Sequence, residues 1–356
     1  MSRPMLLPAV PALWRGPRTL QLGIDPQRAV VLEFANPAVA RLLPLLDGKR
    51  SEPAIIAEAG RRGVPALEAR ALLETLQAQG LVVAANTLLP VSLTEPVRRR
   101  LGAEAAALAL RGTEAPGSPA QVLRRRSTAR VKITGRGRLG VPIALALAGS
   151  GVGHLDPNLE GRVEPGELAD ADTVRRPRRT VAVESITRAA PGTRVSPLRR
   201  ADTSFVVQIG CTAPAPLQAI AYRQHRLAHL AVCVRDGTAV LGPLVPPRGA
   251  PCLNCLELHR KDRDPAWPSL AAQLVAVPEA DPSEACAAAT VLAAAGYAAA
   301  EVLRYIDGDT PHTLGVTVEI TAPGVERRRT WSPHPDCDCV RRRRRRPPTS
   351  QAAGSA

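Results

Sequence analysis

Two close pairs of cysteines constrain the fold of this chain more than any other feature of its sequence. Cys252 and Cys255 form a Cys-x-x-Cys turn after a proline, and Cys337 and Cys339 form a tighter pair further along the chain. Zinc prefers four soft or borderline ligands in a tetrahedron, and two short cysteine-bearing loops supply all four. The sequence therefore predicts a structural Zn²⁺ site that clips the C-terminal end of a domain onto its middle.

The cysteine pairs leave alternatives open. A redox Cys-x-x-Cys normally precedes a helix in a thioredoxin-like unit and needs no second pair. His259 and His334 are close enough in sequence to serve as alternative ligands, although four cysteines suffice. Cys211, Cys233 and Cys286 lie in strand-like or alanine-rich contexts, and we interpret them as small buried apolar residues.

A glycine-rich turn between a strand and a helix indicates a nucleotide-binding type of α/β domain. The strand pattern Arg130–Thr134 is followed by Gly135, Gly137 and Gly140 in Gly-x-Gly-x-x-Gly spacing, and Val141–Ala148 continues as a helix. Such glycines permit a tight turn and close backbone approach, and the helix N-terminus then faces an anion. The alternative is a turn that keeps this shape without binding phosphate.

The strand that follows adds a candidate ribose contact. It reads His154-Leu155-Asp156, and an acid such as Asp156 at the end of this strand typically contacts a ribose hydroxyl. Strand and helix patterns then alternate to about Ser332, which favours a mostly parallel sheet. We therefore predict a Rossmann-like domain with a structural zinc clip over residues 131–340.

The pattern of residues 1–90 predicts a small α+β domain of winged-helix type. Its expected strands and helices are Thr19–Leu22, Ala29–Leu32, Pro37–Leu46, Glu52–Arg62, Pro65–Gln79 and Leu81–Val83. The third helix is expected to bury a face that includes Leu67 and Leu72. Residues 91–130 are predicted to be a helical connector, and residues 341–356 a disordered basic tail.

The formal net charge of +15 invites a nucleic-acid interpretation. Six of these charges form the run Arg341–Arg346, and aromatic residues, which stack on bases, make up only 2% of the chain. We interpret the charge as mostly compositional and do not expect nucleic acid as a partner. No stretch reaches about 18 uninterrupted apolar residues, so no membrane partner is expected. An odd number of cysteines without an export signal favours the cytoplasm.

These motifs together resemble the ThiF/MoeB family of ubiquitin-activating-type adenylyltransferases, over roughly Val97–Cys339. The resemblance is carried by the glycine turn, the Gly151-Val152-Gly153…Asp156 strand and the order of the two cysteine pairs. It implies a fold that binds ATP and Mg²⁺ and adenylates the C-terminus of a small protein, with a zinc clip and, commonly, a homodimer. Arg178 or Arg179 would stand near the family's phosphate-binding lysine, and Arg179 is our candidate.

The sequence departs from that family where the chemistry is expected. The family's strand ends in a carboxylate that holds Mg²⁺, whereas this chain has Val206-Val207-Gln208-Ile209-Gly210-Cys211-Thr212. Without that carboxylate Mg²⁺ loses a ligand. This argues against independent ATP and Mg²⁺ chemistry, and no catalytic residue is assigned.

A narrower resemblance covers the first region. The segments Leu13-Trp14-Arg15, Gln21-Leu22-Gly23, Leu46-Asp47-Gly48 and Gly80-Leu81-Val82 resemble the PqqD-like leader-binding domain that is fused to ThiF-like domains in cyclodehydratase partner proteins. Leu256–Leu274 also resembles the stretch after the first zinc pair in those proteins. The resemblance implies a scaffold that binds the leader of a ribosomal precursor peptide and delivers it to a YcaO-type azoline-forming enzyme. We expect the leader between Ala29–Leu32 and Pro65–Gln79.

Three other functions stay open. An active adenylyltransferase acting on a small carrier protein would show ATP–pyrophosphate exchange. A dinucleotide-dependent oxidoreductase would use Gly135–Gly140, although no plausible proton donor lies near that turn in the sequence. A DNA-binding winged helix is the remaining alternative, and its recognition helix would offer only Arg70 among basic residues.

Overall fold

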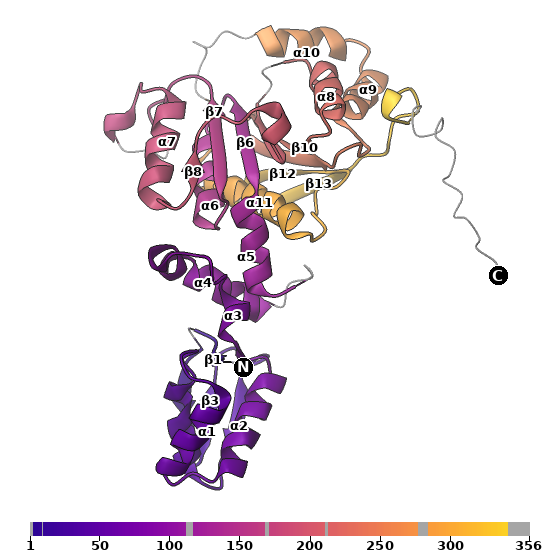
Figure 1. Cartoon of the computed structure of the whole chain (residues 1–356). Helices are drawn as coiled ribbons and strands as arrows, with labels where there is room; N and C mark the ends of the chain where they lie inside the picture. Colours follow the sequence, from indigo (N-terminus) through magenta and orange to yellow (C-terminus); the bar gives the residue numbers. More distant parts are fainter. Residues whose placement is uncertain are drawn as a thin grey trace, which may run out of the picture. The chain divides into compact units, whose positions relative to one another are not determined.

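The chain divides into two compact units in a computed structural model, Met1–Arg125 and Arg126–Ala356 (Figure 1). The structure describes residues 3–8, 10–111, 117–167, 171–210, 213–276 and 284–340. The predicted basic tail lies outside the described residues, as do Cys211 and Thr212. Within the described ranges, no helix is long and apolar enough to cross a membrane.

The first unit begins with a three-stranded antiparallel sheet. It has the order β2 (Ala12–Trp14), β3 (Thr19–Leu22) and β4 (Val30–Glu33), so that β2 and β4 are its two edges. Leu20 and Leu22 of β3 point into a core because side chains alternate along a strand. The 3₁₀ helix η1 (Pro37–Leu45), α1 (Glu52–Arg61) and α2 (Ala66–Ala78) close that core. Strand β5 (Val82–Ala84) pairs with β1 (Pro4–Leu6) in a second, two-stranded sheet.

The local sequence explains most of these elements, but not strands β1 and β2. Asn36 caps η1 because its Oδ1 accepts a hydrogen bond from the backbone N–H of Ala38 (3.0 Å). Strands β1 and β2 were not predicted, because their three-residue length and neighbouring prolines hide any alternation. Leu67 was predicted to be buried but is 80% exposed, so the buried face of α2 begins at Ala69.

The remainder of the first unit has a core of its own. Helices α3 (Ala85–Leu88), α4 (Glu95–Arg111) and α5 (Pro119–Thr128) follow β5. Leu88, Leu101, Leu108 and Leu123 pack together with Leu7. The region predicted to be a connector therefore contains packed helices, with residues 112–116 outside the described ranges.

The second unit is built on an eight-stranded mixed sheet in the order β13-β12-β11-β10-β9-β6-β7-β8. Neighbouring strands from β8 to β10 run parallel, whereas the pairs from β10 to β13 are antiparallel. The strands are β6 (Arg130–Gly135), β7 (His154–Leu159), β8 (Arg194–Val195), β9 (Phe205–Ile209), β10 (Ala228–Arg235), β11 (Thr238–Val245), β12 (Val316–Ala322) and β13 (Val325–Thr330). This is the predicted α/β class, extended by an antiparallel meander.

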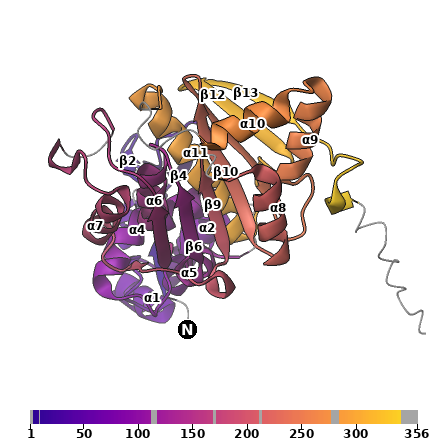
Figure 2. The same ribbon diagram turned by 90° about the horizontal axis from the view of Figure 1, so that it is seen from above.

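Helices cover both faces of the large sheet. On one face, α6 (Gly140–Gly149), α7 (Arg178–Ala189) and α11 (Ala288–Asp307) enclose the main core, to which Leu230 and Val232 of β10 contribute. The intervening Ala231 points to the other face, toward α8 (Ala215–Gln224) and α9 (Leu253–Arg263), which lie side by side (Figure 2). Short elements complete the unit: η2 (Ala171–Thr173), η3 (Arg200–Asp202) and α10 (Trp267–Ala276).

The start of β6 is fixed by buried polar contacts. Arg126 Nη2 lies 2.6 Å from Asp307 Oδ2 at the end of α11, and the two side chains are 4% and 7% exposed. Gly153 packs so closely that a Cβ there would lie 1.8 Å from the carbonyl oxygen of Ser127. These contacts set where β6, and therefore the glycine turn at its end, lies in the sheet.

Candidate functional site

The glycine turn lies at the point where the strand order of the parallel sheet reverses. The chain runs from β6 through α6 to β7 on one side, whereas β9 pairs with β6 on the other. In open α/β sheets, ligands bind at such a point, outside the carboxyl ends of the strands. The turn also contacts the end of β9, because the Arg136 backbone N–H donates to the Ile209 carbonyl oxygen (3.2 Å). The predicted strand, turn and helix are all present.

Each of the three predicted glycines meets a different steric demand. Gly135 has φ +111°, and a Cβ there would lie 2.0 Å from the Ile209 carbonyl oxygen. Gly137 has φ +143°, which side-chain-bearing residues rarely adopt. Gly140 begins α6, and a Cβ there would lie 2.6 Å from Leu159 Cδ2 of β7. The glycines therefore allow close approach of α6 to the sheet, as predicted for this motif.

A carboxylate of the chain itself lies against this turn. The backbone N–H of Arg138 donates to Glu284 Oε2 (2.8 Å), at the N-terminal end of α6. The Arg138 guanidinium donates to the carbonyl oxygens of Glu284 (3.2 Å), Cys286 (2.8 Å) and Gly166 (2.7 Å). Burial raises the pKa of Glu284 above its usual range. Glu284 was not among the residues predicted for this site, since 146 residues separate it from Arg138.

Asp156 lies inside β7 and not at its end. The strand continues through Pro157 to Leu159, beyond the predicted end at Asp156. Asp156 is 2% exposed, with Oδ2 3.4 Å from Lys132 Nζ and 3.0 Å from the Leu198 backbone N–H that donates to it. The acid at the carboxyl end is the exposed Glu160, whose backbone N–H donates to the Gly135 carbonyl oxygen (2.9 Å).

Of the two arginines proposed near the phosphate position, Arg178 is buried and Arg179 is exposed. Arg178 Nη2 lies 2.5 Å from Glu167 Oε1, and its Nη1 donates to the Glu160 carbonyl oxygen (3.3 Å). Sequence alone could not separate the two, because adjacent helical residues differ in direction by about 100°. Cys211, where the magnesium-binding carboxylate was expected, lies outside the described residues.

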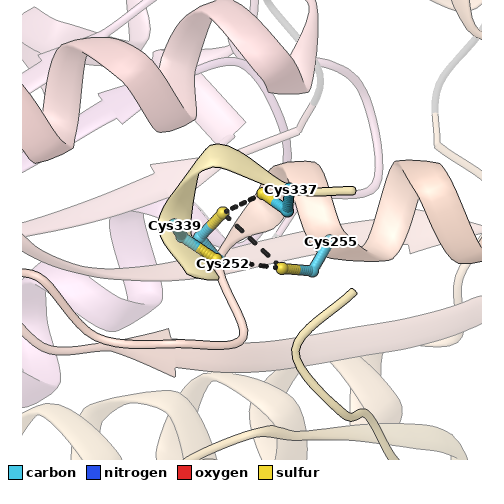
Figure 3. A group of neighbouring side chains, drawn as sticks. All are labelled: Cys252, Cys255, Cys337 and Cys339. Atoms are coloured by element: carbon cyan, nitrogen blue, oxygen red, sulfur yellow. Dashed lines mark hydrogen bonds between the residues drawn. The ribbon is translucent and has the colours of Figure 1, made fainter. Parts of the chain in front are cut away.

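The four predicted cysteine ligands converge in one buried cluster (Figure 3). Cys252 Sγ lies 3.9 Å from Cys255 Sγ and 3.6 Å from Cys337 Sγ, and Cys255 Sγ lies 3.3 Å from Cys339 Sγ. A tetrahedron with metal–sulfur bonds of about 2.3 Å has edges of about 3.8 Å. The donor set therefore fits a structural metal ion.

Neighbouring groups favour thiolates in this cluster. Arg223 Nη2 donates to Cys252 Sγ (3.4 Å), and Asn254 Nδ2 donates to Cys337 Sγ (3.4 Å). Hydrogen bonding with Cys255 lowers the pKa of Cys252, which favours the metal-binding thiolate at that residue, whereas the contacts with Cys252 raise the pKa of Cys255 and Cys339. An ion ligated by four thiolates would carry excess negative charge, and the Arg223 guanidinium offsets part of it.

The two histidines considered as alternative ligands make other contacts. His334 is buried, with Nε2 2.8 Å from Asp262 Oδ2, and His259 Nε2 lies 2.9 Å from the Ser332 carbonyl oxygen. The donor atoms of these two histidines and Asp262 lie within 4.8 Å of one another. They form a polar contact next to the cysteine cluster that joins α9 to the segment after β13.

The three-stranded sheet of the first unit offers two edges for another chain. In β4, Val31 and Leu32 alternate between exposed and half-buried. The Phe34 backbone N–H donates to the Arg18 carbonyl oxygen (2.8 Å). Antiparallel bonds recur at every second residue, so the N–H groups of Val31 and Glu33 point away from β3.

At the opposite edge, β2 borders a groove. The groove of about 630 Å³ is lined by Trp14, Gly16, Pro17, Pro37, Ala38, Ala40 and Arg41. Trp14 is 53% exposed. The Arg15 backbone N–H donates to the Thr19 carbonyl oxygen of β3. Because such bonds recur at every second residue, the N–H groups of Ala12 and Trp14 point away from β3. This groove could not be predicted from the sequence, because it depends on how η1 packs beside β2.

Solved structures with a similar fold span both units. The sequence matches no described protein family and no curated protein. The structure of E. coli MccB with MccA-N7isoASN has a TM-score of 0.61 at 16% identity, covering 95% of this chain and 99% of that chain. The structure of PaaA has a TM-score of 0.61 at 18% identity, covering 91% of this chain and 99% of that chain. The chain therefore shares the fold of MccB and PaaA.

MccB has been solved with several ligands. Its complex with ATP gives a TM-score of 0.59 at 16% identity, covering 94% of this chain and 99% of that chain. The complex of the microcin C7 biosynthetic enzyme MccB with N-formylated MccA gives 0.60 with the same identity and coverage. At these identities, the likeness concerns the fold.

Proposed function

We propose that this protein is a leader-peptide-binding scaffold for the modification of a ribosomally made peptide, acting beside a YcaO-type azoline-forming enzyme in the cytoplasm. In this proposal the first unit, a PqqD-like winged-helix domain, captures the peptide. The second unit, held by a Zn²⁺ ion at its four cysteines, serves as a docking framework for the partner enzyme or for a second copy.

The observation that carries this proposal is the open edge of β4 beside α2. Val31 is 46% exposed at that edge, and Leu67 near the start of α2 is 80% exposed. Asn36 Nδ2 donates to Glu68 Oε2 (3.2 Å), which joins the segment after β4 to α2. An extended peptide could add to β4 through main-chain hydrogen bonds while its alternate side chains contact these apolar residues. The complexes of MccB with MccA add support from a protein of similar fold.

The pairing of Arg178 and Lys132 with carboxylates supports a scaffolding role for the second unit. Arg178 is bound by Glu167, and Lys132 lies 3.4 Å from Asp156. A triphosphate that bound Arg178 would have to displace Glu167 from it. We therefore favour a non-adenylating framework.

Peptide binding can be located with two proline variants. Fluorescein-labelled N-terminal segments of short peptides encoded beside the gene are titrated with the full chain by fluorescence anisotropy. Val31→Pro removes an outward N–H of β4 and keeps the bonds to β3, so affinity should fall at least about tenfold. Ala12→Pro makes the matched change on β2 and should leave affinity unchanged, and melting curves check that both variants fold. The reverse pattern would move the site to β2, and binding of no peptide by the native chain would refute the proposal.

The second candidate is an active adenylyltransferase acting on a small carrier protein. It is favoured by the intact glycine turn at the point where the strand order reverses. ATP–pyrophosphate exchange with the same peptides tests it. Robust exchange would establish this candidate and exclude a purely scaffolding second unit.

A further inference from the structure

The glycine turn already holds an anion that belongs to the chain. Helix N-termini attract anions because their first N–H groups have no partner within the helix. Here the Arg138 N–H, in the turn two residues before α6 begins, donates to Glu284 Oε2 (2.8 Å). A Cβ on Gly137 would lie 2.7 Å from Glu284 Oε1, so the absence of a side chain at Gly137 makes room for this carboxylate. The turn is therefore shaped around Glu284.

The Arg138 side chain also binds the segment 284–286. Its guanidinium donates to the carbonyl oxygens of Glu284 and Cys286, at 3.2 and 2.8 Å. Arg138 thus binds the Glu284 carboxylate through its backbone N–H. Its side chain binds the backbone carbonyl groups of Glu284 and Cys286. This arrangement fixes the segment 284–286 against the turn, just before α11.

Two carboxylates, those of Glu284 and Glu167, oppose the entry of a second anion at the turn. Arg178, which faces Glu284 from α7, is bound to Glu167, and that carboxylate adds negative charge close to Glu284. A polyphosphate entering the turn would compete with Glu284 for the Arg138 N–H and would be repelled by both carboxylates. The turn can bind a phosphate well only after Glu284 has moved away.

We propose that Glu284 is a built-in ligand of the glycine turn that excludes nucleoside triphosphates while segment 284–286 is in place. The turn is then a latent nucleotide site, opened by whatever displaces that segment. The proposal does not depend on peptide binding by the first unit, because every group it uses lies in the second.

Nucleotide titrations test this proposal directly. The probe is N-methylanthraniloyl-ATP with Mg²⁺, followed by fluorescence on the full chain and displaced by unlabelled ATP. Glu284→Ala should bind at least about tenfold more tightly than the native chain. Glu284→Gln should gain less, because its amide oxygen can still accept from Arg138 N–H. Glu326→Gln removes one carboxylate from β13, far along the sheet order from β6, and should change nothing.

A second measurement needs no nucleotide. Hydrogen exchange should show the Arg138 amide protected in the native chain and faster in Glu284→Ala, with the β6 amides unchanged. Equal nucleotide affinity in the native chain and Glu284→Ala would overturn the proposal, whether both bind or neither does. An unprotected Arg138 amide in the native chain would overturn it as well.

Discussion

If the proposed scaffold holds a metal ion at its four cysteines, removal of that ion should loosen the end of the second unit and leave the proposed peptide binding intact. The segment after β13 is joined to α9 by the sulfur cluster and by the His334–Asp262 contact. Trp331 is anchored separately, since its Nε1 donates to Thr317 Oγ1 (3.0 Å) and its backbone N–H to the Gly315 carbonyl oxygen (2.8 Å). Chelation should therefore release the residues after Trp331 while β12 and β13 stay paired.

The size of the effect follows from binding linkage. With free metal at about a thousand times its dissociation constant, binding to the folded state alone contributes about 4 kcal/mol to stability. For a unit of about 200 residues, each kcal/mol shifts Tm by about 2–4 °C. Chelation should therefore lower the Tm of the second unit by roughly 8–16 °C. No cysteine precedes Cys211, so the first unit offers the chelator no thiolate site to strip.

Calorimetry with metal analysis provides the assay. Mass spectrometry should find one zinc per native chain and none in Cys337→Ala, whose Tm should match the chelated protein. Cys233→Ser changes a half-buried cysteine outside the cluster and should retain zinc and native Tm. A native protein that contains no metal, or whose Tm does not respond to chelation, would refute the structural role. Peptide affinity that disappears together with the metal would refute the division between the units.

Two further predictions concern buried ionisable groups of the second unit. Asp307→Asn removes the charge that Arg126 binds in the core and should lower the free energy of unfolding in urea by about 3–5 kcal/mol. Asp202→Asn, in an exposed pair with Arg130, should cost less than about 1 kcal/mol, and equal losses would contradict this reasoning. Burial lowers the pKa of His229 to about 4, so the unfolded state binds more protons between pH 4 and 6.5. Stability from neutral His229 is full above about pH 6.5 and falls by up to about 3 kcal/mol toward pH 4. His229→Phe should reduce the change with pH of the free energy of unfolding, measured by urea denaturation between pH 4 and 6.5. An unchanged slope of that free energy against pH would exclude His229 as its source.

Features that depend on short-range pattern could be predicted from the sequence. The glycine spacing after a β-type run predicted the turn, because a run of closely spaced glycines between a strand and a helix is visible in the sequence even though β7 and β9 set the close contacts of Gly140 and Gly135. The two cysteine pairs indicated one site, because closely spaced soft ligands rarely occur without a shared ion. Strand β3 was predicted with its observed bounds. By contrast, the three-residue strands β1 and β2 carry too little alternation to be recognised.

Contacts between distant residues were decided only by the tertiary structure. Asp156 was expected at a strand end, but its place is set by how far β7 pairs with β6. The choice between Arg178 and Arg179 depends on which side of α7 faces the sheet. Glu284 reaches the turn because α11 and the sheet pack beside α6. Such pairings follow from the burial of whole surfaces. The sequence by itself therefore determined the glycine turn and which cysteines would converge, and packing decided that Glu284 lies against the turn.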